Sequence, residues 1–192
     1  MTELNILFLN DISNEKFLTY FISNDEIKDY FKIHNFNGKK KEMLLVPKQY
    51  LKDSKDTLLI STKEINNDFD ACYLGAVART KVNSDCNITY ETGLVDFPQV
   101  QSFTLGMLLS GYKFDKYLNK KDDSEKISLD TSIMSDEQEV TRDAIYFVRD
   151  LVNTPTLDKT PEYFIDEVKK LIQNEDISLD IHNKEWLQNE GF

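Results

Sequence analysis

Short apolar runs alternate along this chain with stretches of helical period, and this alternation limits the folds that the chain can adopt. The apolar runs are bounded by polar or turn-forming residues, as β-strands are. In the first half they predict strands at residues 4–9, 17–22, 43–46, 57–60 and 86–90. A turn is predicted at Ser23-Asn24-Asp25, directly after the second of these runs.

Segments with a helical period lie between these apolar runs and after them. Apolar residues that recur three and four positions apart lie on one face of a helix. The clearest such face consists of Ile65, Phe69, Cys72, Tyr73, Ala76 and Val77. Ser61 and Glu64 form a predicted capping box at its start. The segment 100–117 also has a helical period but is apolar on more than one side, which predicts a helix sandwiched in a core.

The second half of the chain continues the alternation. Residues 127–133 and 177–181 alternate between apolar and polar side chains and predict strands. Ser135 and Gln138 form a second capping box, for a helix that ends before Pro155. Thr160-Pro161 begins a further helix, and Asn183 caps a short last one. The order of strands and helices indicates an α/β domain with a mixed sheet.

Charge and cysteine content restrict the partners of the protein. With 34 acidic and 23 basic residues, the net charge is −11, which disfavours nucleic acid and anionic membranes as partners. No signal peptide or membrane span is apparent, so we expect a soluble, cytoplasmic protein. Cys72 and Cys86 lack the spacing of a metal or redox pair and are interpreted as buried thiols in a reducing compartment.

No catalytic, metal-binding or cofactor-binding residue is predicted from the residues themselves. The segment 106–113 comes nearest to a phosphate-binding loop, but Tyr112 precedes its lysine, no Ser or Thr follows, and its period is helical. Its two glycines are therefore interpreted as points of close helix packing. His34 and His182 are isolated, whereas a zinc site needs three or four convergent ligands.

The conspicuous charge runs also have structural interpretations. Asp122-Asp123 and Asp136-Glu137 lie in a predicted loop and at a predicted helix start, where acidic side chains solvate the surface or stabilise the helix dipole. Lys39-Lys40-Lys41 follows Gly38 and is interpreted as the solvated flank of a turn. None of these charge runs predicts a catalytic or binding site.

Four segments together carry a resemblance to a known family. Phe147-Val-Arg-Asp-Leu-Val-Asn-Thr-Pro155 and Lys159-Thr-Pro-Glu-Tyr163 are followed by a predicted helix, a predicted strand and Trp186-Leu-Gln-Asn-Glu-Gly-Phe192. Upstream lies Gly111-Tyr-Lys-Phe-Asp-Lys-Tyr117. In content and order these segments resemble the leucyl (cytosol) aminopeptidase family of metallopeptidases, around the point where the catalytic domain opens. The first hundred residues resemble the family only in pattern.

The resemblance implies a subunit of two domains. Residues 1–134 would form a macro-domain-like, non-catalytic α/β domain, and residues 135–192 a linker helix and the beginning of the catalytic domain. In the family the catalytic domain binds two divalent metals (zinc, manganese or magnesium) through a lysine, aspartates and a glutamate, and it hydrolyses N-terminal peptide bonds of peptide substrates. This chain is expected to end before those ligands and to be inactive alone. The complete enzyme is implied to be a homo-hexamer.

The alternative interpretation is a free-standing macro-like module that binds a ligand of the ADP-ribose type without catalysis. Such modules admit the diphosphate through glycine-rich loops. This chain has only six glycines, none of them adjacent or in a Gly-x-Gly arrangement. The aminopeptidase interpretation is therefore preferred.

Overall fold

The computed structural model describes residues 2–82, 86–91, 97–119, 128–129, 133–173 and 176–192. The chain divides into two compact units, Met1–Tyr146 and Phe147–Phe192. The division falls inside a single helix, α5 (Asp136–Asn153). The domain boundary between residues 134 and 135 therefore stays a prediction, and the two units are described separately.

The first unit is built on a mixed five-stranded sheet with the order β2-β3-β1-β4-β5. Its strands are β1 (Thr2–Leu9), β2 (Met43–Val46), β3 (Asp56–Ser61), β4 (Cys86–Glu91) and β5 (Ser128–Leu129). Only β2 runs antiparallel to its neighbour; the other described pairs are parallel. The strands predicted at 4–9, 43–46, 57–60 and 86–90 are confirmed. Of the strand predicted at 127–133, residues 127 and 130–132 lie outside the described residues.

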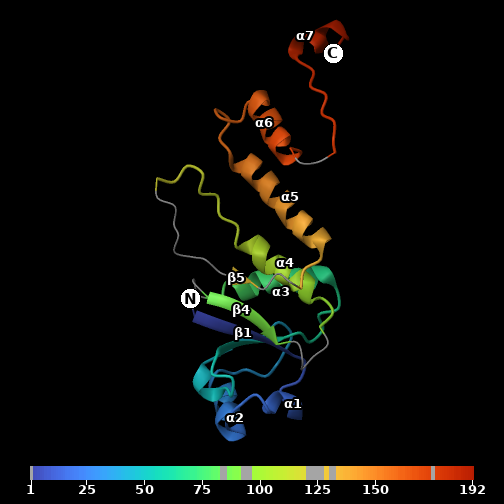
Figure 1. The fold of residues 1–192 in the computed structure, drawn as a ribbon. Helices are drawn as coiled ribbons and strands as arrows, with labels where there is room; N and C mark the ends of the chain where they lie inside the picture. Colours follow the sequence, from blue (N-terminus) through green and yellow to red (C-terminus); the bar gives the residue numbers. More distant parts are fainter. Residues whose placement is uncertain (1, 83–85, 92–96, 120–127, 130–132, 174–175) are drawn as a thin grey trace. The chain divides into compact units, whose positions relative to one another are not determined.

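Helices cover both faces of this sheet (Figure 1). On one face lie α1 (Glu15–Leu18) and α2 (Asn24–Ile33), and on the other lie α3 (Asp68–Arg79) and α4 (Val100–Ser110). Side chains of successive strand residues point to opposite faces. In β1, Leu7 and Leu9 therefore join the core under α1 and α2, whereas Ile6 and Phe8 join the core under α3 and α4. The predicted α/β class with a mixed sheet is confirmed.

The strand predicted at 17–22 is wrong, because this segment begins with α1 and makes only an isolated bridge between Phe21 and Leu51. The rings of Phe17 and Phe21 meet edge to face with centroids 5.0 Å apart, and both also pack on Phe31 of α2. The turn predicted after it is the start of α2, where the Ser23 hydroxyl accepts from the Glu26 N–H. The burial of three aromatic rings against one face of the sheet outweighs the β-propensity of the run.

Helix α3 differs from its prediction in both its start and its buried face. It is capped by Asn67, while Ser61 is the last residue of β3 and donates its hydroxyl to the Gly38 carbonyl at 2.9 Å. The capping box at Ser61 is therefore wrong. Phe69 and Tyr73, predicted to face the core, are 82% and 54% exposed. The buried residues are instead Ala71, Leu74, Gly75 and Ala78.

The small residues are buried because α3 and α4 approach with their backbones in contact. A β-carbon on Gly75 would lie 1.9 Å from the Phe103 carbonyl oxygen, and one on Gly106 would lie 1.9 Å from that of Cys72. The prediction that both glycines of this segment mark close packing is confirmed for Gly106. At Gly111 a β-carbon would meet its nearest atom, the Leu108 carbonyl oxygen, only at 3.3 Å. Helix α4 ends at Ser110 rather than continuing to residue 117.

The capping signals of the second half are confirmed. At the start of α5 the Ser135 hydroxyl accepts from the Gln138 N–H at 3.3 Å, and the Gln138 side chain accepts from the Ser135 N–H at 3.4 Å. Thr160 caps α6 (Pro161–Leu171), and Asn183 caps α7 (Lys184–Asn189). The strand predicted at 177–181 is wrong: none of these residues is in a strand, because a strand exists only where another strand supplies its hydrogen bonds.

Candidate functional site

A cavity of about 500 Å³ opens in the first unit, next to the carboxyl ends of β1 and β3. Asn10 follows β1 directly, and the turn after β3 supplies residues 62–66. The segment Phe97–Gln99, just before α4, completes the described lining. From β1 the chain proceeds to α1 on one face of the sheet, and from β3 it proceeds to α3 on the other. The cavity therefore lies at the topological switch point of the sheet, where open α/β folds bind their ligands.

The two strand ends are tied together beside the cavity. The Thr62 N–H donates to the Leu9 carbonyl at 2.9 Å, and the Thr62 hydroxyl donates to the Asn10 side-chain oxygen. The next residues form a turn closed by the Ile65 N–H and the Thr62 carbonyl at 3.0 Å. Glu64 in this turn has a φ of 62°, a left-handed conformation that costs a non-glycine residue about 1 kcal/mol or more.

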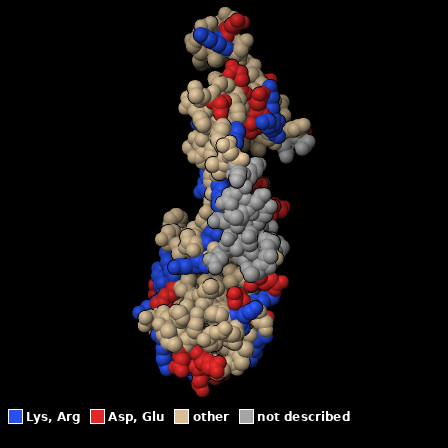
Figure 2. Space-filling view, turned by 90° about the vertical axis from the view of Figure 1, so that its left-hand side faces the viewer, with Lys and Arg blue, Asp and Glu red and all other residues tan. Residues whose placement is uncertain are grey.

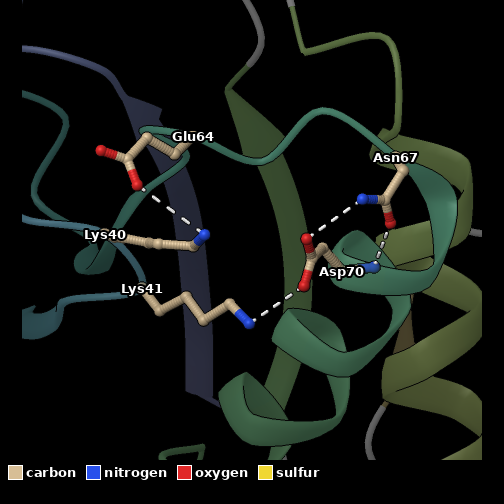
Figure 3. Close-up of polar contacts among 5 residues, drawn as sticks. All are labelled: Lys40, Lys41, Glu64, Asn67 and Asp70. Atoms are coloured by element: carbon tan, nitrogen blue, oxygen red, sulfur yellow. Dashed lines mark hydrogen bonds and ion pairs between the residues drawn. The ribbon is translucent and has the colours of Figure 1, made fainter.

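Ion pairs hold the same turn and the start of α3 (Figure 3). Lys40 reaches the Glu64 carboxylate at 3.7 Å, and Lys41 donates to Asp70 at 3.1 Å. Asp70 also accepts from the Asn67 carboxamide at 3.1 Å. The hydrogen bond from Lys41, followed by that from Asn67, lowers the pKa of Asp70. Lys39 and Lys40 are exposed, as expected of a solvated flank, while Lys40 and Lys41 also pair with carboxylates of the neighbouring turn and helix.

The two histidines pack against aromatic rings, and Cys72 is half-buried in α3. The His34 ring packs on Tyr30 with centroids 4.3 Å apart, and the His182 ring stacks on Trp186 at 3.7 Å. Cys72 is half-buried, and that burial raises the pKa of its thiol. Cys86 lies in β4, and Asp122-Asp123 lies outside the described residues.

The described part of the chain contains no group of three His, Cys, Asp or Glu side chains that could hold a metal ion. It therefore supplies no ligand set for the two divalent metals that the family resemblance implies. In the same residues, no helix has the length and apolar character needed to cross a membrane. Basic and acidic side chains are interspersed on the face of the first unit shown in Figure 2.

The segment that carries the resemblance forms the end of α5 and the start of α6, within the second unit. Thr154 is 2% exposed, and its hydroxyl donates to the Asp150 carbonyl at 2.7 Å. The Lys159 ammonium donates to the Leu151 carbonyl at 3.0 Å, where a cation satisfies the last carbonyls of a helix. Thr160 then caps α6 by accepting from the Tyr163 N–H at 3.2 Å. The motif residues thus specify a helix end followed closely by a helix start.

Sequence comparison finds relatives over most of the chain, although no family model matches it. A probable cytosol aminopeptidase of Aquifex aeolicus (strain VF5) is 27% identical in an alignment 185 residues long, which covers 88% of this chain and 37% of the relative. A probable cytosol aminopeptidase of Sulfurihydrogenibium sp. (strain YO3AOP1) is 25% identical, with the same shares of the two chains. The chain thus spans little more than a third of the length of these relatives.

Solved structures share the fold. The cytosol aminopeptidase of Coxiella burnetii matches with a TM-score of 0.67 and 17% identity, over 98% of this chain and 39% of its own. A mutant tomato leucine aminopeptidase matches with a TM-score of 0.63 and 16% identity, over 98% of this chain and 43% of its own. The bottromycin maturation enzyme BotP in complex with Mn matches with a TM-score of 0.70 and 13% identity, over 100% of this chain and 40% of its own.

In its mixed sheet and over most of its length, this chain is thus similar to part of proteins named as cytosol or leucine aminopeptidases. The names of these relatives and the shared fold support the resemblance to the leucyl (cytosol) aminopeptidase family.

Proposed function

We propose that this chain is the N-terminal portion of a leucyl-type metallo-aminopeptidase, whose complete form releases N-terminal amino acids from peptides. The observation that supports this most strongly is the extent of the sequence match, which covers 88% of this chain and 37% of the relatives, both of them named as probable cytosol aminopeptidases. Since relatives of this kind are named for the cytosol, we place the complete protein in the cytoplasm. A free-standing ADP-ribose-binding module is not favoured, because the relatives are aminopeptidases.

The role of this chain in that reaction is structural. Two divalent metals (manganese, zinc or magnesium), held by residues beyond the described ones, would make a water nucleophilic near neutral pH and polarise the peptide carbonyl. One of the solved structures that share the fold is that of BotP in complex with Mn. This chain contributes the α/β domain and the helices α5 and α6, and the complete protein assembles as a homo-hexamer. The chain alone is inactive.

Two measurements test the proposal. The first is sequencing of the coding region after the codon for Phe192: an open frame with a lysine, aspartates and a glutamate in the family's order supports the proposal, and an immediate stop codon contradicts it. The second is an assay of this 192-residue chain with a leucine chromogenic amide after loading with manganese or zinc. Turnover that survives purification and disappears with a chelator would show that the chain itself is catalytic.

A further inference from the structure

The cavity beside β1 and β3 has the chemistry of a ligand site that the proposed peptidase activity does not use. We propose that it binds a short peptide, through the peptide's amide groups and its free carboxylate, without cleaving it. The volume of about 500 Å³ lies within the range of small-molecule sites, which is about 300–1,000 Å³. Its place at the topological switch point is where the backbone of an open α/β sheet leaves room for a ligand.

The polar part of the lining matches amide groups. Asn10, Asn66 and Gln99 contribute three carboxamides, each with two N–H donors and a carbonyl acceptor. The Asn10 oxygen accepts from Thr62, which leaves its N–H groups for a ligand. Within the described part of the chain, the side chains of Asn66 and Gln99 make no hydrogen bond, so both of their groups can pair with a peptide unit.

The apolar part of the lining suits a side chain. Ile65 is 6% exposed and Phe97 is 7% exposed, so both are fixed in the core under α3 and α4. With Pro98 they give the cavity an apolar wall beside its carboxamides. A few placed polar groups on an apolar wall are typical of sites that fix the orientation of a small ligand.

The charges of the lining favour a carboxylate. Glu64 is the described acidic residue of the lining, and its charge is balanced by the ion pair with Lys40 (Figure 3). Lys63 is the described basic residue of the lining. Asp11 feels its charge, but no carboxylate of the described residues lies within ion-pair distance of Lys63, so its ammonium can pair directly with a ligand. A ligand carboxylate beside Lys63 would gain a charge-assisted hydrogen bond, which is stronger than a neutral one.

The site is also largely formed before a ligand arrives. The Thr62–Asn10 hydrogen bond joins the two strand ends, and the bond from the Ile65 N–H to the Thr62 carbonyl closes the turn that contains Glu64. Groups that are already ordered lose less conformational entropy on binding. The inference goes beyond the proposed function and does not depend on it, because it concerns binding without turnover.

The test is an NMR titration of the 192-residue chain with the dipeptide leucylglycine, compared with N-acetylleucinamide and inorganic phosphate. We expect saturable amide shifts confined to Asn10, residues 62–66 and Phe97–Gln99, weaker binding of the uncharged amide, and no matching effect of phosphate. If no saturable shift reaches these amides at about 10 mM dipeptide, or if phosphate reproduces the dipeptide's shifts, the proposal is wrong.

Two lysine variants separate a specific contact from general electrostatics. Lys63→Met should weaken dipeptide binding about tenfold, since it removes the partner of the carboxylate. Lys28→Met changes the net charge equally but lies exposed on α2, and it should leave the affinity unchanged. Equal weakening by both variants would contradict the proposed site. The spectra themselves report whether each variant is folded.

Discussion

Gly106 of α4 lies directly against the carbonyl oxygen of Cys72 in α3, where a β-carbon would stand only 1.9 Å from that oxygen. Gly75 of α3 makes the matching contact, since a β-carbon there would lie 1.9 Å from the Phe103 carbonyl oxygen. The two helices therefore touch through their backbones on the side of the sheet where Phe103 and Met107 are fully buried. Any side chain at either glycine must push the helices apart and open the core beneath them.

Replacing Gly106 with alanine should therefore destabilise the first unit. We expect Gly106→Ala to lower the free energy of unfolding by about 3 kcal/mol, because the methyl group overpacks a contact formed by backbone atoms that cannot rotate away. Denaturant unfolding followed by circular dichroism measures the change.

Gly111→Ala is the matched control for this substitution. At Gly111 a β-carbon would meet its nearest atom, the Leu108 carbonyl oxygen, at 3.3 Å, and the φ of −83° suits alanine. We expect a change below about 1 kcal/mol. Equal effects of the two substitutions would mean that α3 and α4 approach less closely than the structure shows.

The ion pair of Asp70 predicts a dependence of stability on pH. The hydrogen bond from Lys41 lowers the pKa of Asp70 from its usual 3.8, so the folded state binds this proton less readily than the unfolded state. The resulting stabilisation is full above about pH 3.8 and is lost as the pH falls through the lower pKa of the folded state. Relative to Asp70→Asn, the wild-type chain should be more stable at neutral pH and lose that advantage in acid.

The control for this prediction removes Lys41, the main hydrogen-bond partner of Asp70. In a Lys41→Met background the effect of Asp70→Asn on stability should shrink at every pH, since the first cause of the lowered pKa is gone. Thermal unfolding between about pH 2 and pH 7 measures both comparisons. A difference that grows in acid would have the wrong sign for this explanation.

Thr154 should stabilise the helix end that carries the family resemblance. Its hydroxyl and that of Thr141 each donate to the carbonyl four residues earlier at 2.7 Å, but Thr154 is buried and Thr141 is exposed. Losing the hydrogen bond of a buried hydroxyl costs about 1 kcal/mol, whereas water can replace the bond of an exposed one. We expect faster amide exchange at the end of α5 in Thr154→Val and little change in Thr141→Val. Identical exchange in both variants would contradict the buried role.

Helices α4 and α5 should also differ in stability. Helix α4 buries Phe103 and Met107 completely, whereas α5 contains no buried residue and exposes Val140 and Val148 by 68% and 55%. Segments with few buried apolar side chains open at lower free energy. Hydrogen exchange of the intact chain should therefore be faster in α5 than in α4, with α3 as the internal reference for α4. If both exchange only on global unfolding, the boundary predicted at residues 134 and 135 is misplaced.

The parts of this fold that the sequence determined are those whose interactions lie within a few residues. The Ser135–Gln138 capping box, the Thr160 and Asn183 caps, and the strand β1 were all predicted correctly, since a capping bond joins residues three apart and a buried strand is a short apolar run. The absence of catalytic residues, also expected from the sequence, stays a prediction. The cavity at the ends of β1 and β3 was not predicted, because its lining comes from three segments that only the fold brings together.

Tertiary structure decided which apolar residues are buried and which strands are formed. Hydrophobic spacing selected Phe69 and Tyr73 as the inner face of α3, but α4 approaches too closely for aromatic rings and buries Gly75 and its small neighbours instead. Residues 177–181 alternate as a strand would, yet they form no strand, because no neighbouring strand completes their hydrogen bonds. Periodicity specifies that a face is apolar, whereas the distance and identity of the neighbouring element determine whether it is covered.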